Sequence, residues 1–410
     1  MTRDQHTDWV GVALGLGLAC LGAFQLFKLP FVMPILLESY GYDRVLAGGF
    51  MSIYAAAGLL LSVPFGRWIT GHGAFTPVLA ALAVISAGNL LGLLAPEQGL
   101  VMLAARALEG IGFTVLAIAG PVLANRHAAP RHRPVVIGMT AGWIPVGQLT
   151  AGGLAPLLAD GLGWQALWII GLGLNAAMLL WLLKRRAIVE TEPGGHGEST
   201  NRGKMPTLSP ALLILLIVTG GVFLCWSGQY FAAMTWLPQY FVEAQGLSLA
   251  WAQIGSLLPV AVLLGVNLIT GMLIGRGLSI GALLSLALAS QALLWWCLPA
   301  LDGAGLALGA AALVLYGIGA GVSPTCLFAM PNALVGVQRS QARAFGIIMT
   351  GRNLGVLLGP VVLAEAYKRA ENWTVAAPVF GSATLVALLL GFVLWAGLAR
   401  LRHESQGTKR

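Results

Sequence analysis

The chain alternates between long apolar runs and short polar connections over its whole length. Each run has about 20 residues or more, which is enough for a helix to cross about 30 Å of hydrocarbon. The runs are rich in Leu, Ala and Gly and lack strand signals, so they favour helices over the strands of a barrel. The pattern predicts twelve membrane-spanning helices, near residues 9–37, 45–66, 76–95, 99–122, 135–159, 165–183, 209–241, 249–273, 279–300, 305–329, 343–366 and 374–399.

The composition leads to the same class. The chain has 410 residues, of which 58% are hydrophobic and only 9% are charged. Soluble domains carry about 25% charged residues, so this chain cannot cover itself with a water-soluble surface. The net charge of +8 does not indicate nucleic-acid binding, because the basic residues lie in short loops beside apolar runs. We therefore expect an all-α integral membrane protein.

The distribution of Lys and Arg predicts the topology. If both termini are cytoplasmic, seventeen basic residues lie on the cytoplasmic side and three lie outside. This asymmetry satisfies the positive-inside rule and predicts a multi-pass protein of the cell inner (plasma) membrane. The three basic residues that remain, Lys28, Arg106 and Arg352, fall at membrane depth.

The two halves of the chain repeat each other. Gln25 and Pro34 of the first run recur as Gln229 and Pro238 of the seventh, and glycines of later runs recur in the same way. The offsets are about 204 to 208 residues, which indicates a duplicated six-helix unit, a known transporter design. The predicted domains are an N-terminal six-helix bundle at 1–186, a cytoplasmic linker at 187–208 and a C-terminal six-helix bundle at 209–410.

Several glycine motifs recur at particular helices. The loop after the second run resembles a G-x-x-x-D-R-x-G-x-R-R signature, although Thr70 and Gly71 replace its acidic and basic residues. The fourth run contains RALEGIG, which resembles R-x-x-x-G-x-G and places Arg106 on the arginine. The eleventh run meets a G-x8-G-x3-G-P pattern in full, and the fifth run meets it in part. The motif residues are Gly66, Gly73, Gly138, Gly147, Gly355, Gly359 and Pro360.

Taken together, these motifs resemble those of the major facilitator superfamily, and the resemblance covers nearly the whole chain. It implies twelve helices in two pseudo-symmetric bundles that rock around a central site. The glycine pattern of the eleventh run is typical of the fifth segment of the family's antiporters. The porter type that the resemblance suggests is that of cyanate, nitrate or organic anions.

Arg352 is the strongest candidate for substrate contact. It lies about 9 residues, or roughly 14 Å, along its helix from Arg343 at the predicted cytoplasmic face. A guanidinium at mid-depth costs at least about 2.5 kcal/mol, so it usually faces a cavity or a protein interior. Its counterpart in the repeat is Ile144, so the charge belongs to one half only. The alternative is a structural arginine bonded to backbone carbonyls or to a carboxylate.

Lys28 is the second candidate, with Gln25 one turn before it on the same helical face. Its counterpart in the repeat is Ala232. The resemblance implies that the first segment lines the central cavity, whereas the alternative is a lysine that extends to the outer headgroups. Further amides and aromatics could supply hydrogen bonds or walls of a substrate site, although such residues more often serve packing: Gln229, Tyr230, Trp143 and Asn353.

Arg106 and Glu109 are three residues apart, so they share a face of the fourth helix and can neutralise each other. Glu109 is the one carboxylate expected well inside the membrane. A buried carboxylate beside an arginine is a candidate proton-coupling site, and the alternative is a structural ion pair.

The buried charges favour one class of substrate. Three cations against one carboxylate leave a net charge of +2, which attracts an anion and rejects a cation at low dielectric. We therefore expect a secondary active transporter for a small anion, inorganic or a carboxylate, working by alternating access with ion or proton coupling. The alternative is a proton-driven efflux antiporter for drugs or metabolites.

Other classes of protein receive no support. A sensor lacks a large soluble domain, and an enzyme lacks a nucleophile and base at one depth. The glycine clusters contain no G-x-x-x-x-G-K-[ST], so we expect no ATP hydrolysis. The six histidines lie in loops or tails, so no metal site is expected. We also expect no cofactor, no nucleic-acid partner and a functional monomer in the lipid bilayer.

Overall fold

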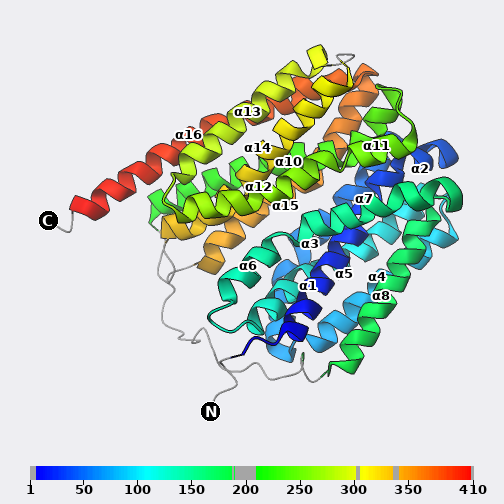
Figure 1. Ribbon diagram of the computed structural model, residues 1–410, viewed down its shortest axis with the longest axis horizontal. Helices are drawn as coiled ribbons and strands as arrows, with labels where there is room; N and C mark the ends of the chain where they lie inside the picture. The colour runs from blue at the N-terminus through cyan, green and yellow to red at the C-terminus, as the bar shows by residue number, and fades with distance from the viewer. Residues whose placement is uncertain (1–5, 187–188, 190–208, 302–304, 336–340, 408–410) are drawn as a thin grey trace. The chain divides into compact units, whose positions relative to one another are not determined.

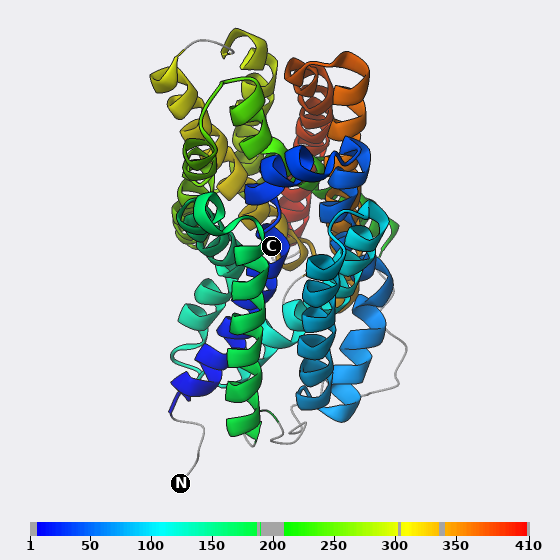
Figure 2. The same cartoon turned by 90° about the vertical axis from the view of Figure 1, so that its right-hand side faces the viewer.

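The computed structural model describes residues 6–186, 189, 209–301, 305–335 and 341–407. Within these ranges the chain consists of helices and short connections, without a strand (Figures 1 and 2). The helices before the polar stretch are α1 (Trp9–Phe27), η2 (Pro30–Val32), α2 (Met33–Tyr40), α3 (Arg44–His72), α4 (Phe75–Leu94), α5 (Gly99–Arg126), α6 (Arg133–Ala141), α7 (Trp143–Leu162) and α8 (Gln165–Lys184).

The helices after the polar stretch include some of the longest in the chain. They are α10 (Pro210–Glu243), α11 (Leu249–Gly255), α12 (Leu258–Gly275), α13 (Ile280–Leu301), α14 (Leu306–Val335), α15 (Gln341–Ala370), η3 (Trp373–Val375) and α16 (Ala376–Gly407). Eleven helical spans among the described residues are long and apolar enough to cross a membrane. The predicted all-α membrane class is confirmed.

Three predicted runs are interrupted. The run at 135–159 forms α6 and α7, which are separated at Gly142, and it is not among the eleven spans. The first run breaks after Lys28 and continues through η2 and α2, because Pro30 has no N–H to continue the helix. The eighth run divides into α11 and α12 just before Pro259.

The chain divides into two compact units by its internal contacts. The first unit contains 1–200 and 235–257, and the second contains 201–234 and 258–410. The segment 235–257 joins the first unit through specific contacts: Arg44 pairs with Glu243 at 2.5 Å, and Gln253 donates to the Phe31 carbonyl at 2.7 Å. The predicted linker at 187–208 lies outside the described residues except for Val189, so the domain boundaries stay a prediction.

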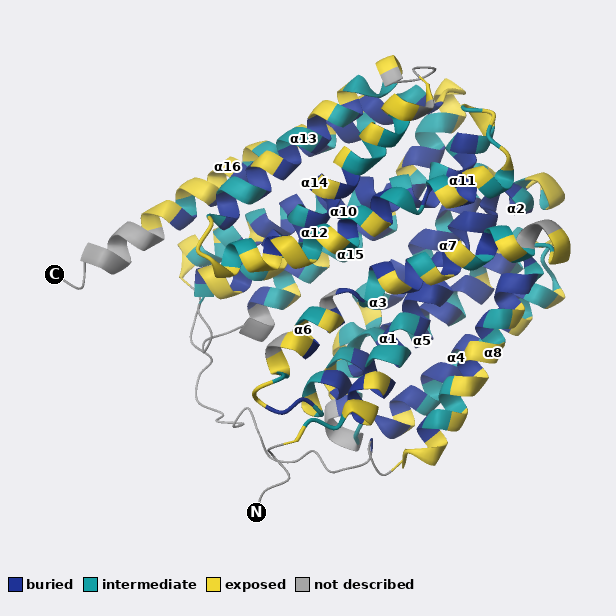
Figure 3. Cartoon of the chain, in the orientation of Figure 1, coloured by how far each residue is buried: buried dark blue, intermediate teal, exposed yellow. Residues whose placement is uncertain are grey.

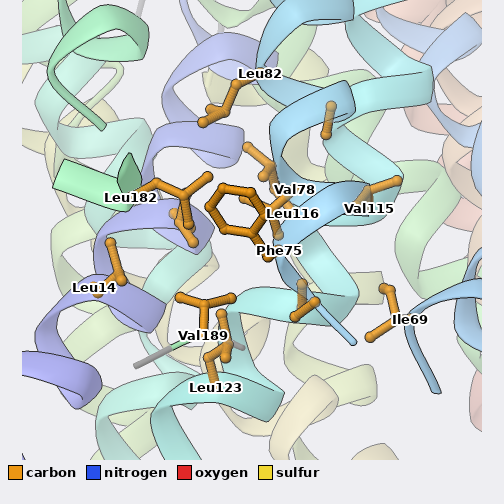
Figure 4. Packing of buried hydrophobic residues seen from close by; sticks show 14 of the residues in the cluster. Leu14, Ile69, Phe75, Val78, Leu82, Val115, Leu116, Leu123, Leu182 and Val189 are labelled. Atoms are coloured by element: carbon orange, nitrogen blue, oxygen red, sulfur yellow. The ribbon is translucent and has the colours of Figure 1, made fainter. Parts of the chain in front are cut away.

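A large apolar core holds the first unit together (Figure 4). Helices α1, α3, α4, α5 and α8 contribute to it, and Figure 4 labels ten of its side chains: Leu14, Ile69, Phe75, Val78, Leu82, Val115, Leu116, Leu123, Leu182 and Val189. Large apolar side chains are also exposed, for example Leu94, Leu286 and Leu389. Exposed positions recur along many of the helices (Figure 3). Such apolar exposure fits a surface that faces lipid.

Among the close helix contacts that glycines allow, one pair in each unit is equivalent by the repeat: α1 with α7, and α10 with α15. A Cβ at Gly147 of α7 would collide with the backbone of α1 at Cys20 and Phe24. A Cβ at Gly355 of α15 would collide with Leu224 of α10, and one at Gly359 would collide with Gly228. Backbones approach this closely in membranes where small residues remove the intervening side chains. The two pairs occupy equivalent places in the repeat, which supports the duplication inferred from the sequence.

Candidate functional site

The first unit contains a fully buried group of polar side chains, which we call the polar cluster. Helices α1, α3, α4 and α5 and the C-cap residue of α1 supply its members, and none of the members has a buried polar atom without a hydrogen-bond partner. All are at most 1% exposed. The polar cluster consists of Gln25, Lys28, Tyr54, Asn89, Arg106 and Glu109.

Lys28 lies at the centre of the polar cluster. Its ammonium donates to Gln25 Oε1 at 2.8 Å, to Asn89 Oδ1 at 2.5 Å and to Glu109 Oε1 at 3.1 Å. It also lies 4.2 Å from the centroid of the Trp168 ring, a cation–π contact from α8. An ammonium has three donors, so each of them is in use. Lys28 therefore does not extend to the headgroups, which was the alternative expectation.

Arg106 and Glu109 form the predicted pair. Arg106 NH1 donates to Glu109 Oε2 at 2.5 Å, and both side chains are 0% exposed. The guanidinium also donates to three backbone carbonyls, those of Gln25, Leu26 and Phe50, at 2.9 to 3.2 Å. The Tyr54 hydroxyl donates to Glu109 Oε2 at 2.5 Å. Three donors therefore hold the two carboxylate oxygens.

The polar cluster is electrically unbalanced. Two cations, Lys28 and Arg106, face one carboxylate, Glu109, which leaves one net positive charge with no exposure to solvent. Removing water from an ion costs several kcal/mol even in relaxed protein, and opposite charge must repay it. The complete hydrogen bonding stabilises this arrangement. The polar cluster would nevertheless be neutral if it held one proton fewer.

The second unit has a neutral counterpart at the equivalent place in the repeat. Gln229, the partner of Gln25 by the repeat, accepts at Oε1 from Trp295 Nε1 at 2.7 Å and from the Tyr316 hydroxyl at 3.1 Å. Tyr316 corresponds to Glu109, and Gln291 corresponds to Asn89, at offsets of 202 to 207 residues. Gln291 is fully buried, and neither its oxygen nor its nitrogen has a hydrogen-bond partner.

Arg352 has a different environment from Arg106. Its NH1 donates to Asn353 Oδ1 at 3.1 Å, and its guanidinium lies 5.6 Å from the centroid of the Phe231 ring on α10. Its backbone carbonyl accepts from Ser227 at 2.8 Å, which fixes the helix pair at this level. Within the part of the chain that the structure describes, no carboxylate lies within ion-pair distance of the Arg352 side chain. A guanidinium has five N–H donors, so several remain available.

The other predicted substrate residues are divided between the units. Tyr230 lies in the second unit and stacks on Trp226, with ring centroids 5.2 Å apart and an interplanar angle of 8°. Asn353 lies beside Arg352 and accepts its hydrogen bond. Trp143 lies in the first unit, where its ring is 5.9 Å from Phe113. Their proposed contact with substrate stays a prediction.

The predicted glycine motif contains two kinds of position. Gly147, Gly355 and Gly359 pack tightly on neighbouring helices, as described above. Gly66, Gly73 and Gly138 have no atom within 4 Å of an added Cβ, so packing does not require glycine there. Pro360 lies inside α15 directly after Gly359. A conformational role for these residues stays a prediction.

Sequence reasoning missed the residues that complete the polar cluster. Asn89 and Tyr54 are single polar groups in apolar runs, and Trp168 supplies an aromatic face. The repeat did indicate that Asn89 is unusual, because an amide side chain, Gln291, stands in the corresponding run of the second half. Nothing in the sequence alone showed that Lys28 and Glu109, which are 81 residues apart, are in contact.

The fold and these buried groups describe a helical membrane carrier, and comparison defines its class. The model of the Major Facilitator Superfamily matches residues 14–360. The chain therefore belongs to this superfamily, whose members are transporters, and the predicted membership is confirmed. It is a multi-pass membrane protein.

Particular relatives differ in what they move. A hexuronate transporter of Bacillus subtilis (strain 168) is 25% identical over 236 residues, which cover 56% of this chain and 54% of the relative. The MFS thioclapurine efflux transporter tcpA of Claviceps purpurea (strain 20.1) is 26% identical over 129 residues, which cover 31% of this chain and 23% of the relative. The chain thus spans about half and about a quarter of their lengths.

A solved structure supports the fold. It is that of a bacterial homologue of the human lysosomal transporter Spinster, in an inward-facing and occupied conformation. The TM-score is 0.71, with 15% sequence identity, and the match covers 96% of each chain. At this identity the similarity concerns the fold alone.

Proposed function

We propose that this transporter moves a small anion, inorganic or a carboxylate, and that Arg352 binds it. The observation that supports this proposal is the spare hydrogen-bonding capacity of Arg352, which has one amide partner and no carboxylate among the described residues. Arg106 differs, because three carbonyls and Glu109 occupy its donors. A planar guanidinium binds carboxylate-like anions through two parallel hydrogen bonds.

The surroundings of Arg352 suit an anion that has a carbon skeleton. Phe231 lies beneath the guanidinium, and Tyr230 contacts Phe231 edge to face, with centroids 5.5 Å apart. These rings form an apolar wall and leave the guanidinium donors as the polar attraction. The hexuronate transporter among the relatives moves a sugar acid, which makes a uronate a reasonable first probe.

The experiment measures uptake into liposomes that contain the purified full chain. The probes are glucuronate, nitrate and cyanate, and the variants are Arg352→Gln and Arg352→Lys. Hydrogen bonds to a charged group are worth about 1.5–3 kcal/mol, so Arg352→Gln lowers affinity by about tenfold to a hundredfold. The matched control is Arg369→Gln, the same change at an exposed position of the same helix.

The proposal requires that Arg352→Gln loses uptake while its thermal unfolding midpoint stays close to that of the native protein. Arg352→Lys keeps the charge and loses the two-point geometry. Its affinity for the anion therefore lies between that of the native protein and that of Arg352→Gln. Undiminished uptake of every transported probe by Arg352→Gln would exclude Arg352 as the anion site.

A second candidate is a proton-driven efflux antiporter for drugs or metabolites. The observation that favours it is the glycine series of α15 on α10, since the resemblance links this pattern to antiporters. Liposomes with an acidic interior distinguish the two functions. An antiporter takes up its solute as protons leave, whereas an anion carrier that moves protons and anions together expels both.

A further inference from the structure

The polar cluster holds one proton more than its charge balance requires, and the structure identifies which group can release it. Of the three charged groups, Arg106 is excluded, because a guanidinium stays protonated in proteins. The choice is therefore between Glu109 gaining a proton and Lys28 losing one. Among the residues that the structure describes, Tyr54 of α3 is the other titratable side chain in contact with them, whereas α4 and α8 present Asn89 and Trp168.

Adding a proton to Glu109 makes the polar cluster less stable. The net charge would rise from one to two positive charges inside a group with no exposure to solvent. A protonated carboxyl group must also donate its hydrogen, and both oxygens face donors from Lys28, Arg106 and Tyr54. Of these three donor groups, Tyr54 is the one whose oxygen could also accept a hydrogen bond, if its hydroxyl group rotated. Glu109 is thus arranged as the counter-ion that the two cations share.

Removing a proton from Lys28 has the opposite effect. The remaining charges, Arg106 and Glu109, balance at their 2.5 Å contact. A neutral amine keeps two N–H donors, which suffice for the short bonds to Asn89 and Gln25 at 2.5 and 2.8 Å. The bond that is lost is the longest of the three, to Glu109 at 3.1 Å. Glu109 still accepts from Arg106 and Tyr54 after the change.

We infer that Lys28 is the proton-exchanging group of this transporter, and that Glu109 is its fixed counter-ion. The ammonium of Lys28 gives one proton to a water molecule, which leaves a neutral amine and a hydronium ion, and the reverse step restores the cation. Lys28 is therefore a coupling residue and does not bind the anion. This assignment departs from both roles expected from the sequence, in which Lys28 contacts substrate and Glu109 carries the proton.

The repeat places this exchange in the first unit alone. The positions that correspond to Lys28, Asn89 and Glu109 in the second unit are Ala232, Gln291 and Tyr316, and none of them carries a charge. The second unit instead contains Arg352 on α15. We assign the proton to one half and the anion to the other. The link between the two events rests on the proposed function, but the proton exchange of Lys28 does not.

The test observes the Lys28 amine directly and needs no substrate. The chain has only five lysines, so a protein labelled with 13C at lysine Cε gives few signals. The Lys28 signal is the one missing from Lys28→Gln, or from Lys28→Arg if the first variant does not fold. We expect it to move between its ammonium and amine positions as the pH is raised, while the signals of the other four lysines keep their ammonium positions.

A parallel measurement follows the carboxyl carbon of Glu109, with the signal assigned by Glu109→Gln. An ammonium signal for Lys28 that does not move with pH overturns the inference, as does a Glu109 signal that moves while that of Lys28 does not. Undiminished anion uptake by Arg352→Gln would refute the proposed function and leave this result intact, because the two experiments share no ligand.

Discussion

Neutralising Glu109 should harm this protein far more than neutralising Lys28, although both residues belong to one buried ion pair. Glu109→Gln removes the carboxylate that Lys28 and Arg106 share and leaves two buried cations. Breaking a buried pair in this way costs about 3–5 kcal/mol. The cost is full at a pH at which Lys28 keeps its proton, because both cations then stay dehydrated at 0% exposure.

Lys28→Met has a smaller net effect because its losses and gains oppose each other. The losses are three hydrogen bonds, at about 0.6 kcal/mol each in a membrane, and a cation–π contact of about 2 kcal/mol. The gain is the desolvation of one ion, which is several kcal/mol. We expect a net change within about 2 kcal/mol. Adding Lys28→Met to Glu109→Gln should therefore raise stability, because it removes one of the two unpaired cations.

Thermal unfolding in detergent, followed by tryptophan fluorescence, tests this order. The expected midpoints fall from the native protein and Lys28→Met to the double variant, and then to Glu109→Gln. The rescue is the decisive comparison, since two independent losses could only add. If Lys28→Met lowers the midpoint of Glu109→Gln further, or if the two single variants unfold together, the charge argument is wrong.

Three further predictions concern packing, coupling and recognition. Gly355→Ala should lower the unfolding midpoint through a cost of about 1–3 kcal/mol, because its Cβ meets the backbone of α10, whereas Gly346→Ala has open space and should be neutral or slightly stabilising. Lys28→Met should move an anion down its gradient without acidifying a trapped pH dye, whereas native protein moves both; acidification by the variant contradicts this. Arg352→Lys should bind the transported anion about tenfold more weakly, measured by uptake at graded concentrations, because it loses two-point contact.

Much of the fold could be predicted from the sequence, because each spanning helix is a local consequence of an apolar run. The first run is an example: its predicted start near residue 9 was correct, whereas the predicted continuous span to residue 37 breaks after Lys28, where Pro30 has no N–H. The glycine pattern of the eleventh run was also identified from the sequence, and the backbone of α10 lies against Gly355 and Gly359. Such features depend on residue type and helical spacing alone.

The candidate site could be predicted only in part. Arg106 and Glu109 are close because they are three residues apart on one helix, so their pairing was accessible. The contacts of Lys28 join α1 to α4, α5 and α8, and they depend on how these helices rotate about their axes. Apolar helices in lipid lack the clear polar face that would reveal this rotation. The sequence therefore predicted the number of buried cations. It did not predict which of them have hydrogen-bond and ion-pair partners within the protein.

The break in the first run has a consequence for Arg106 as well. In an unbroken helix the N–H of residue 30 would bind the carbonyl of Leu26, but proline has no N–H to offer. That carbonyl instead accepts from Arg106 NH2 at 2.9 Å. An arginine of α5 thus terminates α1, as a capping side chain would. Pro30→Ala would restore a backbone N–H that competes for the Leu26 carbonyl. Pro30 therefore keeps this carbonyl available to the Arg106 guanidinium.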